Sequence, residues 1–287
     1  MTTRTPPVWD GDVLHLDGAP RATVDPGTDL PVVASPRPFL HPVRTPSGVL
    51  VTDSAPADHL HHHGVGLAVP DVDGTSHWGG RTYVRGTGST LLANHGAQRT
   101  VATRREGGTR HDDVEWSDEA SRVQLRERRT LRAVAAGTGT PGWVLRWRSV
   151  LVPERDLTVG SPATNGRAGA FYGGWFWRTP FTAAAVEVEE GPGTDRAHGS
   201  TSRWLSVQGP DAHLLAVQRG TPRPWFVRSE GYVGFGPALA HHDRLALRAG
   251  VPFEVAVDVL VADGPAPAGA ARGALAADLD ALDGGAW

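Results

Sequence analysis

Short runs in which apolar and polar residues alternate make up most of this chain, and such runs are typical of β-strands with one buried face. The 36 glycines and 23 prolines of the chain separate these runs, and few stretches have the period of a helix. The predicted strands cover residues 12–16, 31–33, 48–52, 61–69, 82–85, 99–104, 113–117, 122–131, 142–151, 157–162, 172–178, 185–189, 204–208, 214–218, 225–229, 245–247 and 252–261. So many strands cannot form one open sheet without curling or splitting. We therefore predict an all-β fold, a large two-sheet β-sandwich.

One helix is predicted near the C-terminal end, over residues 270–282. This stretch is rich in alanine, and Leu275, Leu279 and Leu282 recur at the spacing of one helical face. Two glycines follow it, as is typical of a helix end. We expect the helix to pack on the sandwich within a single domain of residues 1–287, because no linker or internal repeat divides the chain.

The clearest alternation lies in one of the middle strands. It places Trp143, Leu145 and Trp147 on one face and Arg146 and Arg148 on the other. The strand before it is also rich in arginine. The two strands together predict either a polar concave face or a solvated outer face of the sandwich.

The histidines of the chain are concentrated in one segment. Six of the 13 lie within 37 consecutive positions, namely His41, His59, His61, His62, His63 and His77. Imidazole titrates near neutral pH and is the commonest metal ligand in proteins, so such clustering indicates chemistry. We take residues 38–67 as the candidate site.

The spacing of these histidines predicts how they would be arranged if residues 59–63 were extended. Alternation then puts His59, His61 and His63 on one face and His62 on the other. Gly64 and the glycine two residues later would let another backbone approach closely.

Three uses of this cluster are open. The histidines can act as acids, bases or hydrogen-bonding groups for a substrate. They can hold a divalent metal, with His59, His61 and His63 as ligands. They can also form a solvent-exposed or structurally hydrogen-bonded patch. We favour the first use and expect no cofactor, because no carboxylate lies within the histidine run itself.

The candidate catalytic residues have distinct expected roles. Asp58 and His59 are neighbours that can orient each other, and His61 or His62 would move the proton. Arg178 would hold the substrate or a developing negative charge. His41, which precedes a proline and is therefore extended, is the expected partner across the sheet.

Aromatic residues next to polar groups give the candidate substrate-binding set. Tryptophan and tyrosine offer a flat apolar body with a polar handle, which suits the C–H faces and hydroxyl groups of sugars. Arginine forks to carboxylates or hydroxyl pairs. On these grounds we expect Trp78, Tyr172, Trp225 and Arg228 to contact substrate. In the segment around Tyr172, alternation groups that tyrosine with Arg178 and places two tryptophans on the opposite face.

Composition excludes several classes of protein. The chain has no cysteine, which removes disulfides and thiolate chemistry, and its 28 basic residues are all arginine, which removes Schiff-base and P-loop lysines. A net charge of −3 argues against a nucleic-acid partner. No apolar run approaches the ~20 residues that span a bilayer, and the start of the chain lacks a secretory pattern. We expect a cytoplasmic protein without a membrane partner, and its oligomeric state stays open.

The motifs together resemble a bacterial family known as the PmoA family, a domain of unknown function. They lie at residues 39–42, 56–64, 73–78, 172–178 and 224–228. The resemblance covers roughly residues 30–264 and implies association with sugar-degrading genes and a sandwich similar to the galactose mutarotase fold. The family name implies a membrane-embedded methane monooxygenase subunit, which the lack of a spanning segment argues against. The family more often has arginine where this chain has His63, which weakens the case for a role of His63.

These observations predict a carbohydrate-active enzyme that uses a His/Asp/Arg cluster for acid–base chemistry of the epimerase, lyase or hydrolase kind. The expected partner is a small-molecule carbohydrate. The first alternative is a non-catalytic carbohydrate-binding protein, in which aromatic side chains stack on sugar rings. The second is a histidine-ligated metalloenzyme. A fold-level similarity does not decide among them.

Overall fold

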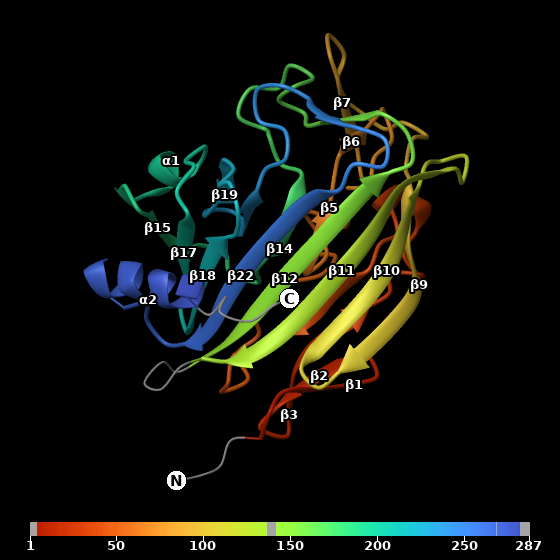
Figure 1. Cartoon of the computed structure of the whole chain (residues 1–287). Coiled ribbons are helices and arrows are strands. Elements are labelled where there is room, and N and C mark those ends of the chain that lie inside the picture. Colours follow the sequence, from red (N-terminus) through yellow and green to blue (C-terminus); the bar gives the residue numbers. More distant parts are fainter. Residues whose placement is uncertain (1–4, 137–141, 268, 282–287) are drawn as a thin grey trace.

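Two large antiparallel sheets face each other in the computed structural model, which describes residues 5–136, 142–267 and 269–281 (Figure 1). Each sheet takes strands from both halves of the chain. The predicted all-β sandwich with a short C-terminal helix is confirmed.

The first sheet has eight strands within the described residues. In spatial order they are β1 (Val8–Asp10), β2 (Val13–Leu16), β3 (Ala19–Asp25), β4 (Phe39–Val43), β5 (Val65–Ala68), β14 (Gly174–Arg178), β20 (Gly234–Pro237) and β19 (Trp225–Arg228). We call it the eight-stranded sheet.

The second sheet has nine strands over the same described ranges. In spatial order they are β16 (Gly191–Pro192), β15 (Ala185–Val188), β17 (Trp204–Gln208), β18 (Ala212–Gln218), β22 (Phe253–Asp263), β12 (Gly142–Pro153), β11 (Val123–Ala135), β10 (Thr109–Ser117) and β9 (Ala97–Glu106). We call it the nine-stranded sheet.

Smaller elements complete the fold. The short strands are β21 (Leu245–Leu247), β13 (Leu157–Gly160) and β6 (Asp71–Val72) in one group and β7 (Thr82–Val84) and β8 (Gly88–Thr90) in another. The helices are the 3-10 turn η1 (Val32–Ala34), α1 (Thr194–Ala197) and α2 (Gly269–Ala281). None of these described helices is both long and apolar enough to cross a membrane.

Tryptophans fill the space between the two sheets. Among the described residues, the fully buried ones are Trp116, Trp143, Trp147, Trp175, Trp177 and Trp225. Buried indoles keep a polar N–H that needs an acceptor. Trp177 Nε1 donates to the Val51 carbonyl at 2.7 Å, and Trp143 Nε1 donates to the Arg44 carbonyl at 2.9 Å. The hydrogen bonds orient the rings and tie loops to the sheets.

The predicted two-faced strand is β12. Trp143, Leu145 and Trp147 point into the core between the sheets, as the alternation indicates. One end of its other face is also covered, because Val144 joins a second apolar cluster there with Leu279 of α2. Arg146 on that face is consequently buried and forms an ion pair with Asp258 at 3.0 Å. Leu282, expected on the same helix face, lies outside the described residues.

Some strand predictions are wrong, for local reasons. The run predicted at residues 31–33 forms η1, and residues 48–52 contribute only isolated bridge pairing. The strand predicted from residue 61 begins at Val65, because the residues before it form turns. Strands β3 and β4 were not predicted, and both contain a proline that interrupts the alternation.

A buried carboxylate links three strands of the nine-stranded sheet. Glu127 on β11 accepts hydrogen bonds from Arg129 Nε at 2.7 Å, Trp116 Nε1 at 2.9 Å and Ser149 Oγ at 2.5 Å. Both charged side chains are almost completely buried. The charges are tolerated because each one is paired and hydrogen-bonded.

Replacing Glu127 by alanine is expected to lower the free energy of unfolding by about 3–5 kcal/mol, because Arg129 would remain as an uncompensated buried charge. The matched control is Glu254→Ala, which removes a partly exposed partner of Arg148 and should cost about 1 kcal/mol or less. Urea denaturation followed by tryptophan fluorescence measures both. Equal losses in the two variants would contradict the role assigned to Glu127.

Candidate functional site

A cavity of about 430 Å³ lies on the outer face of the eight-stranded sheet and collects most of the predicted site residues. On β14, Trp175 and Trp177 enter the core while Phe176 faces outward, as the alternation predicts. Phe176 and Phe226 join an apolar cluster on that outer face. The lining residues that sequence analysis had singled out are Asp58, His59, His61, His62, Trp78, Tyr172 and Arg228.

The histidine segment is a pair of turns and not a strand. The His59 amide donates to the Pro56 carbonyl, and the His62 amide donates to the His59 carbonyl, each at 2.9 Å. As a result the His59 ring lies 4.5 Å from that of His62 and 6.0 Å from that of His61, measured between centroids. The turns bring together side chains that an extended segment would have separated.

His63 points away from this group. Its Nδ1 lies 3.0 Å from Ser54 Oγ, and its ring packs 4.9 Å from that of Phe39. The predicted alternation of His59, His61 and His63 on one face is therefore wrong. The metal ligand set that depended on it is wrong for the same reason. Over the described ranges, no three histidine or carboxylate side chains are arranged to hold a metal ion.

Arg37 connects the segments that form the cavity wall. Its buried guanidinium donates to the Ala34 and Ser35 carbonyls at 2.7 and 3.0 Å. It also donates to the Trp78 carbonyl at 3.0 Å and to the His61 carbonyl at 2.7 Å. Burial lowers the pKa of Arg37 to about 9, so the group is charged at neutral pH. Sequence analysis did not identify Arg37, because its partners are backbone carbonyl groups, two of which, those of His61 and Trp78, belong to distant loops.

A glycine makes room for one of the histidines. Gly80 has a φ of +72°, and a Cβ atom added there would lie 2.9 Å from His61 Nδ1. The Gly80 carbonyl faces His95 Nε2 at 2.7 Å. The bare backbone therefore lets the His61 ring rest against this loop.

Burial favours the neutral form of His61 and His62. Desolvation lowers the pKa of His61 to about 4, with the positive charge of Arg37 as the next cause. The pKa of His62 falls further, for the same first reason. Aromatic rings surround His62, with centroids of Phe176 and Tyr232 at 5.4 and 5.5 Å, and its Nδ1 has no hydrogen-bond partner in the described chain.

Asp58 and His59 form the contact expected of them. Asp58 Oδ2 lies 2.7 Å from His59 Nδ1. The hydrogen bond from His59 is the main cause that lowers the pKa of Asp58. An ionised carboxylate at Nδ1 sets the tautomer and orientation of the imidazole.

Arg178 lies behind the cavity wall rather than on it. Its Nη2 is 3.8 Å from both Asp53 Oδ2 and Asp58 Oδ1, and its guanidinium carbon is 4.7 Å from the centre of the Tyr232 ring. Nε and Nη1 of this buried side chain have no hydrogen-bond partner among the residues that the structure describes. Arg178 thus contacts two residues of the wall, Asp58 and Tyr232, from the protein side.

Two predicted residues lie elsewhere. His41 does not line the cavity, and its Nδ1 is 3.0 Å from Thr52 Oγ1. Trp225 is 0% exposed and donates from Nε1 to the Ser202 carbonyl, so the expectation that it stacks on a ligand is wrong. Alternation along β19 places Trp225 opposite Phe226 and Arg228, and that pattern was available in the sequence.

Sequence analysis missed several residues that line the cavity. They are Arg81, Arg167, Phe226 and Tyr232, together with small residues. Phe226 shares the strand face of Arg228, which is a usable signal. Tyr232, Arg81 and Arg167 lie in loops, where no period connects them with the histidines.

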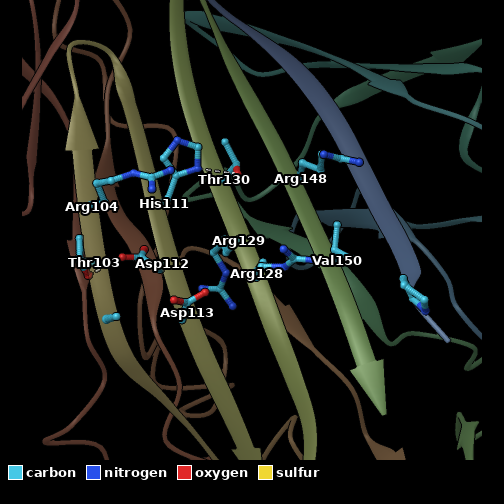
Figure 2. Close-up of a pocket in the computed structure, with 12 residues that line it drawn as sticks. Thr103, Arg104, His111, Asp112, Asp113, Arg128, Arg129, Thr130, Arg148 and Val150 are labelled. Carbon is cyan, nitrogen blue, oxygen red and sulfur yellow. Dashed lines mark hydrogen bonds between the residues drawn. The ribbon is translucent and has the colours of Figure 1, made fainter. Parts of the chain in front are cut away.

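A second hollow, of about 590 Å³, lies on the outer face of the nine-stranded sheet (Figure 2). Arg104, His111, Thr130 and Arg148 lie in register across β9 to β12. His111 Nδ1 is 3.0 Å from Thr130 Oγ1, and Arg148 pairs with Glu254 at 2.6 Å. This is the arginine-rich face predicted from the two middle strands, and it is an outer face.

The fold and the site together define a β-sandwich protein with a histidine-lined cavity on one outer face. The chain belongs to the family of unknown function DUF6807, whose model matches residues 13–276. The resemblance to the PmoA family stays a prediction. No curated protein is similar enough in sequence to match the chain.

Solved structures that match this chain carry names related to galactose mutarotase. A galactose mutarotase-like protein from Lactobacillus casei is 9% identical, with 90% of this chain and 99% of that chain covered and a TM-score of 0.48. Galactose 1-epimerase from Lactobacillus acidophilus is 8% identical, with 92% and 99% covered and a TM-score of 0.40. A galactose mutarotase related enzyme from the same organism is 9% identical, with 90% and 97% covered and a TM-score of 0.43. At these identities the site has to be interpreted from its own residues.

Stability is expected to fall as the pH drops from about 6.5 to about 4. The unfolded chain protonates its histidines near pH 6.5, whereas burial lowers the folded pKa of His61, His77 and His213 to about 4. The unfolded state therefore binds more protons in this range, which favours unfolding by about 1.4 kcal/mol per pH unit for each such histidine. Above pH 6.5 this contribution is complete and constant. Urea denaturation across the range measures it, and a flat profile would contradict the burial of these rings in neutral form.

Replacing Arg37 by methionine is expected to lower the free energy of unfolding by at least about 3 kcal/mol, because four carbonyl groups would lose a buried donor. Arg99→Met is the matched control, since the Arg99 side chain is 75% exposed and should contribute within about 0.5 kcal/mol. Thermal and urea denaturation give both values. A loss no larger than that of the control would show that the loops do not depend on Arg37.

Proposed function

We propose that this protein is a carbohydrate-active enzyme that performs acid–base chemistry on a sugar or sugar derivative in the histidine-lined cavity. The reaction is of the epimerase, lyase or hydrolase kind. The observation that carries the proposal is the Asp58–His59 pair, with Asp58 Oδ2 and His59 Nδ1 2.7 Å apart, at the wall of a cavity that aromatic side chains also line.

The aromatic rings support a sugar ligand. Trp78 and Tyr172 pack with their centroids 4.7 Å apart, and Phe226 lies 5.6 Å from Tyr172. Such rings offer apolar surface to the C–H faces of a sugar, while nearby imidazole and guanidinium groups bind hydroxyls. The volume of about 430 Å³ falls in the usual range of small-molecule sites, roughly 300–1,000 Å³.

His59 is the proposed proton-accepting group. In a neutral imidazole, a hydrogen bond from Nδ1–H to the Asp58 carboxylate places the lone pair on Nε2, which is the tautomer that a general base requires. Asp58 also stabilises the imidazolium once the proton has been taken.

Tyr232 is the proposed proton donor. Its ring lies 4.8 Å from that of His59, and burial raises its pKa, so it keeps its proton at neutral pH. Arg178 acts as a positioning residue, because it touches Asp58 and Tyr232 from behind the wall. His62, enclosed by aromatic rings, packs the centre of the group.

A non-catalytic sugar-binding protein is the second candidate. The aromatic walls and the neutral, enclosed His62 favour it, since both suit binding without proton transfer. In the enzyme Asp58 and His59 transfer a proton, whereas in the binding protein they only contact the sugar. Substitution of these two residues distinguishes the candidates.

Replacing His59 by glutamine, or Asp58 by asparagine, is expected to lower kcat by roughly 10²- to 10⁴-fold while sugar affinity changes much less, because a positioned proton-transfer group is worth about that much. The control is His111→Gln, on the outer face of the nine-stranded sheet, which should leave kcat unchanged. Turnover and calorimetric affinity are measured on the same variants with glycosides, 3-keto-glycosides and free sugars. If sugars bind without turnover and the variants change affinity alone, the enzyme hypothesis is wrong and the protein is a sugar-binding protein.

A further inference from the structure

The histidine-lined cavity contains arginines that no carboxylate neutralises. Arg81, Arg167 and Arg228 line it, and no ion pair found within the described ranges includes any of them. Asp58 is the one carboxylate among the described lining residues, and its Oδ2 is occupied by His59. The wall therefore has an excess of positive charge, although the whole chain has a net charge of −3.

This excess is not a general property of an arginine-rich chain. Arg110 pairs with Asp12 at 2.6 Å and with Asp112 at 2.8 Å. Arg244 pairs with Asp71 at 2.7 Å. Arginines elsewhere in the structure thus commonly face carboxylates, and the cavity is a place where three together do not.

Two of these arginines act on tyrosine phenols of the cavity. Arg167 lowers the pKa of Tyr172 and Arg228 lowers the pKa of Tyr232, in each case against the larger effect of burial, which raises it. The Arg228 guanidinium also packs 5.3 Å from the Phe226 ring. A guanidinium has five N–H donors, which a ligand in the cavity can use.

The positive charges converge on one part of the cavity. The electrostatic effects of Arg228, Arg178 and Arg167 all reach the Tyr232 phenol. Arg178 adds its charge from behind, with Nε and Nη1 unpartnered within the described chain. Within the described part of the chain, the Arg81 side chain makes only a long hydrogen bond, of 3.4 Å, to the Ser89 carbonyl.

We infer that the sugar bound in this cavity carries an anionic oxygen group, a carboxylate or a phosphate, that Arg81, Arg167 and Arg228 recognise. The inference rests on the proposed function and adds the substrate class to it. Charge-assisted hydrogen bonds from guanidinium groups to such oxyanions are strong and are often bidentate. The three arginines are exposed, so with a neutral sugar their guanidinium groups would be solvated by water, whereas an oxyanion would pair with them directly.

The test compares matched sugars on the wild-type protein. The pairs are glucose with glucuronate, galactose with galacturonate, and glucose with glucose 6-phosphate. We expect at least one anionic member to bind or react roughly 10-fold or more better than its neutral partner, since hydrogen bonds to charged groups have that strength. The preference should weaken as salt is raised. The uronates test recognition of a carboxylate, and glucose 6-phosphate tests recognition of a phosphate. Measuring them separately identifies which oxyanion the cavity recognises.

Substitutions then assign the preference to the cavity. Arg167→Gln and Arg228→Gln are each expected to weaken the anionic sugar by roughly 10- to 100-fold and the neutral sugar by less than about 3-fold. Arg228→Lys, which keeps the charge, should lose less than Arg228→Gln. Arg104→Gln, an exposed arginine on β9 in the other sheet, is the control and should change neither affinity.

Two outcomes would overturn the inference in different ways. If neutral sugars bind or react as well as the anionic ones, the substrate class is wrong and the proposed function stands. If no member of any pair binds or reacts, both are wrong. The comparison on wild-type protein decides between these outcomes even if a variant fails to fold, which thermal denaturation would reveal.

Discussion

A buried positive charge without a carboxylate partner is the constraint on which the site depends. The guanidinium of Arg37 is 3% exposed, and a cation in that environment has to be solvated by protein dipoles. Carbonyl groups of residues 34, 35, 61 and 78 solvate it, and they belong to three segments that are far apart in the chain. Satisfying one ion therefore fixes the histidine turns against the loop that carries Trp78. The geometry of the site therefore depends on the solvation of Arg37 by these carbonyl groups.

The position of the cavity follows from the need to cover apolar side chains on the outer face of the eight-stranded sheet. The strands β14 and β19 are apolar on both faces, with tryptophans inward and Phe176 and Phe226 outward. The outward rings cannot be left bare, and the loops that cover them carry the histidines, Trp78 and Tyr172. The histidine side chains thus lie over an apolar surface. That surface lowers the local polarity and keeps the imidazoles of His61 and His62 neutral.

The electrostatics of the cavity combine two features. Desolvation removes charge from His61 and His62, while the surrounding arginines remain cationic. Neutral imidazole next to a positive potential can accept a proton from, or hydrogen-bond, a substrate that the arginines hold. The aromatic rings supply affinity that does not depend on charge. These properties are the basis of the proposed enzyme for a sugar derivative.

Patterns that repeat over a few residues were enough to predict the local features of this protein. Alternation correctly assigned the faces of β12 and β14, the C-terminal helix was correctly predicted except for Leu282, which lies outside the described residues, and the adjacency of Asp58 and His59 predicted their contact. Only the tertiary structure decided which faces are covered and by what. The histidine turns depend on a guanidinium two dozen residues earlier in the chain, and Arg167 and Tyr232 reach the cavity through loops. A local pattern is blind to such contacts, because each one is set by packing between segments that are distant in sequence.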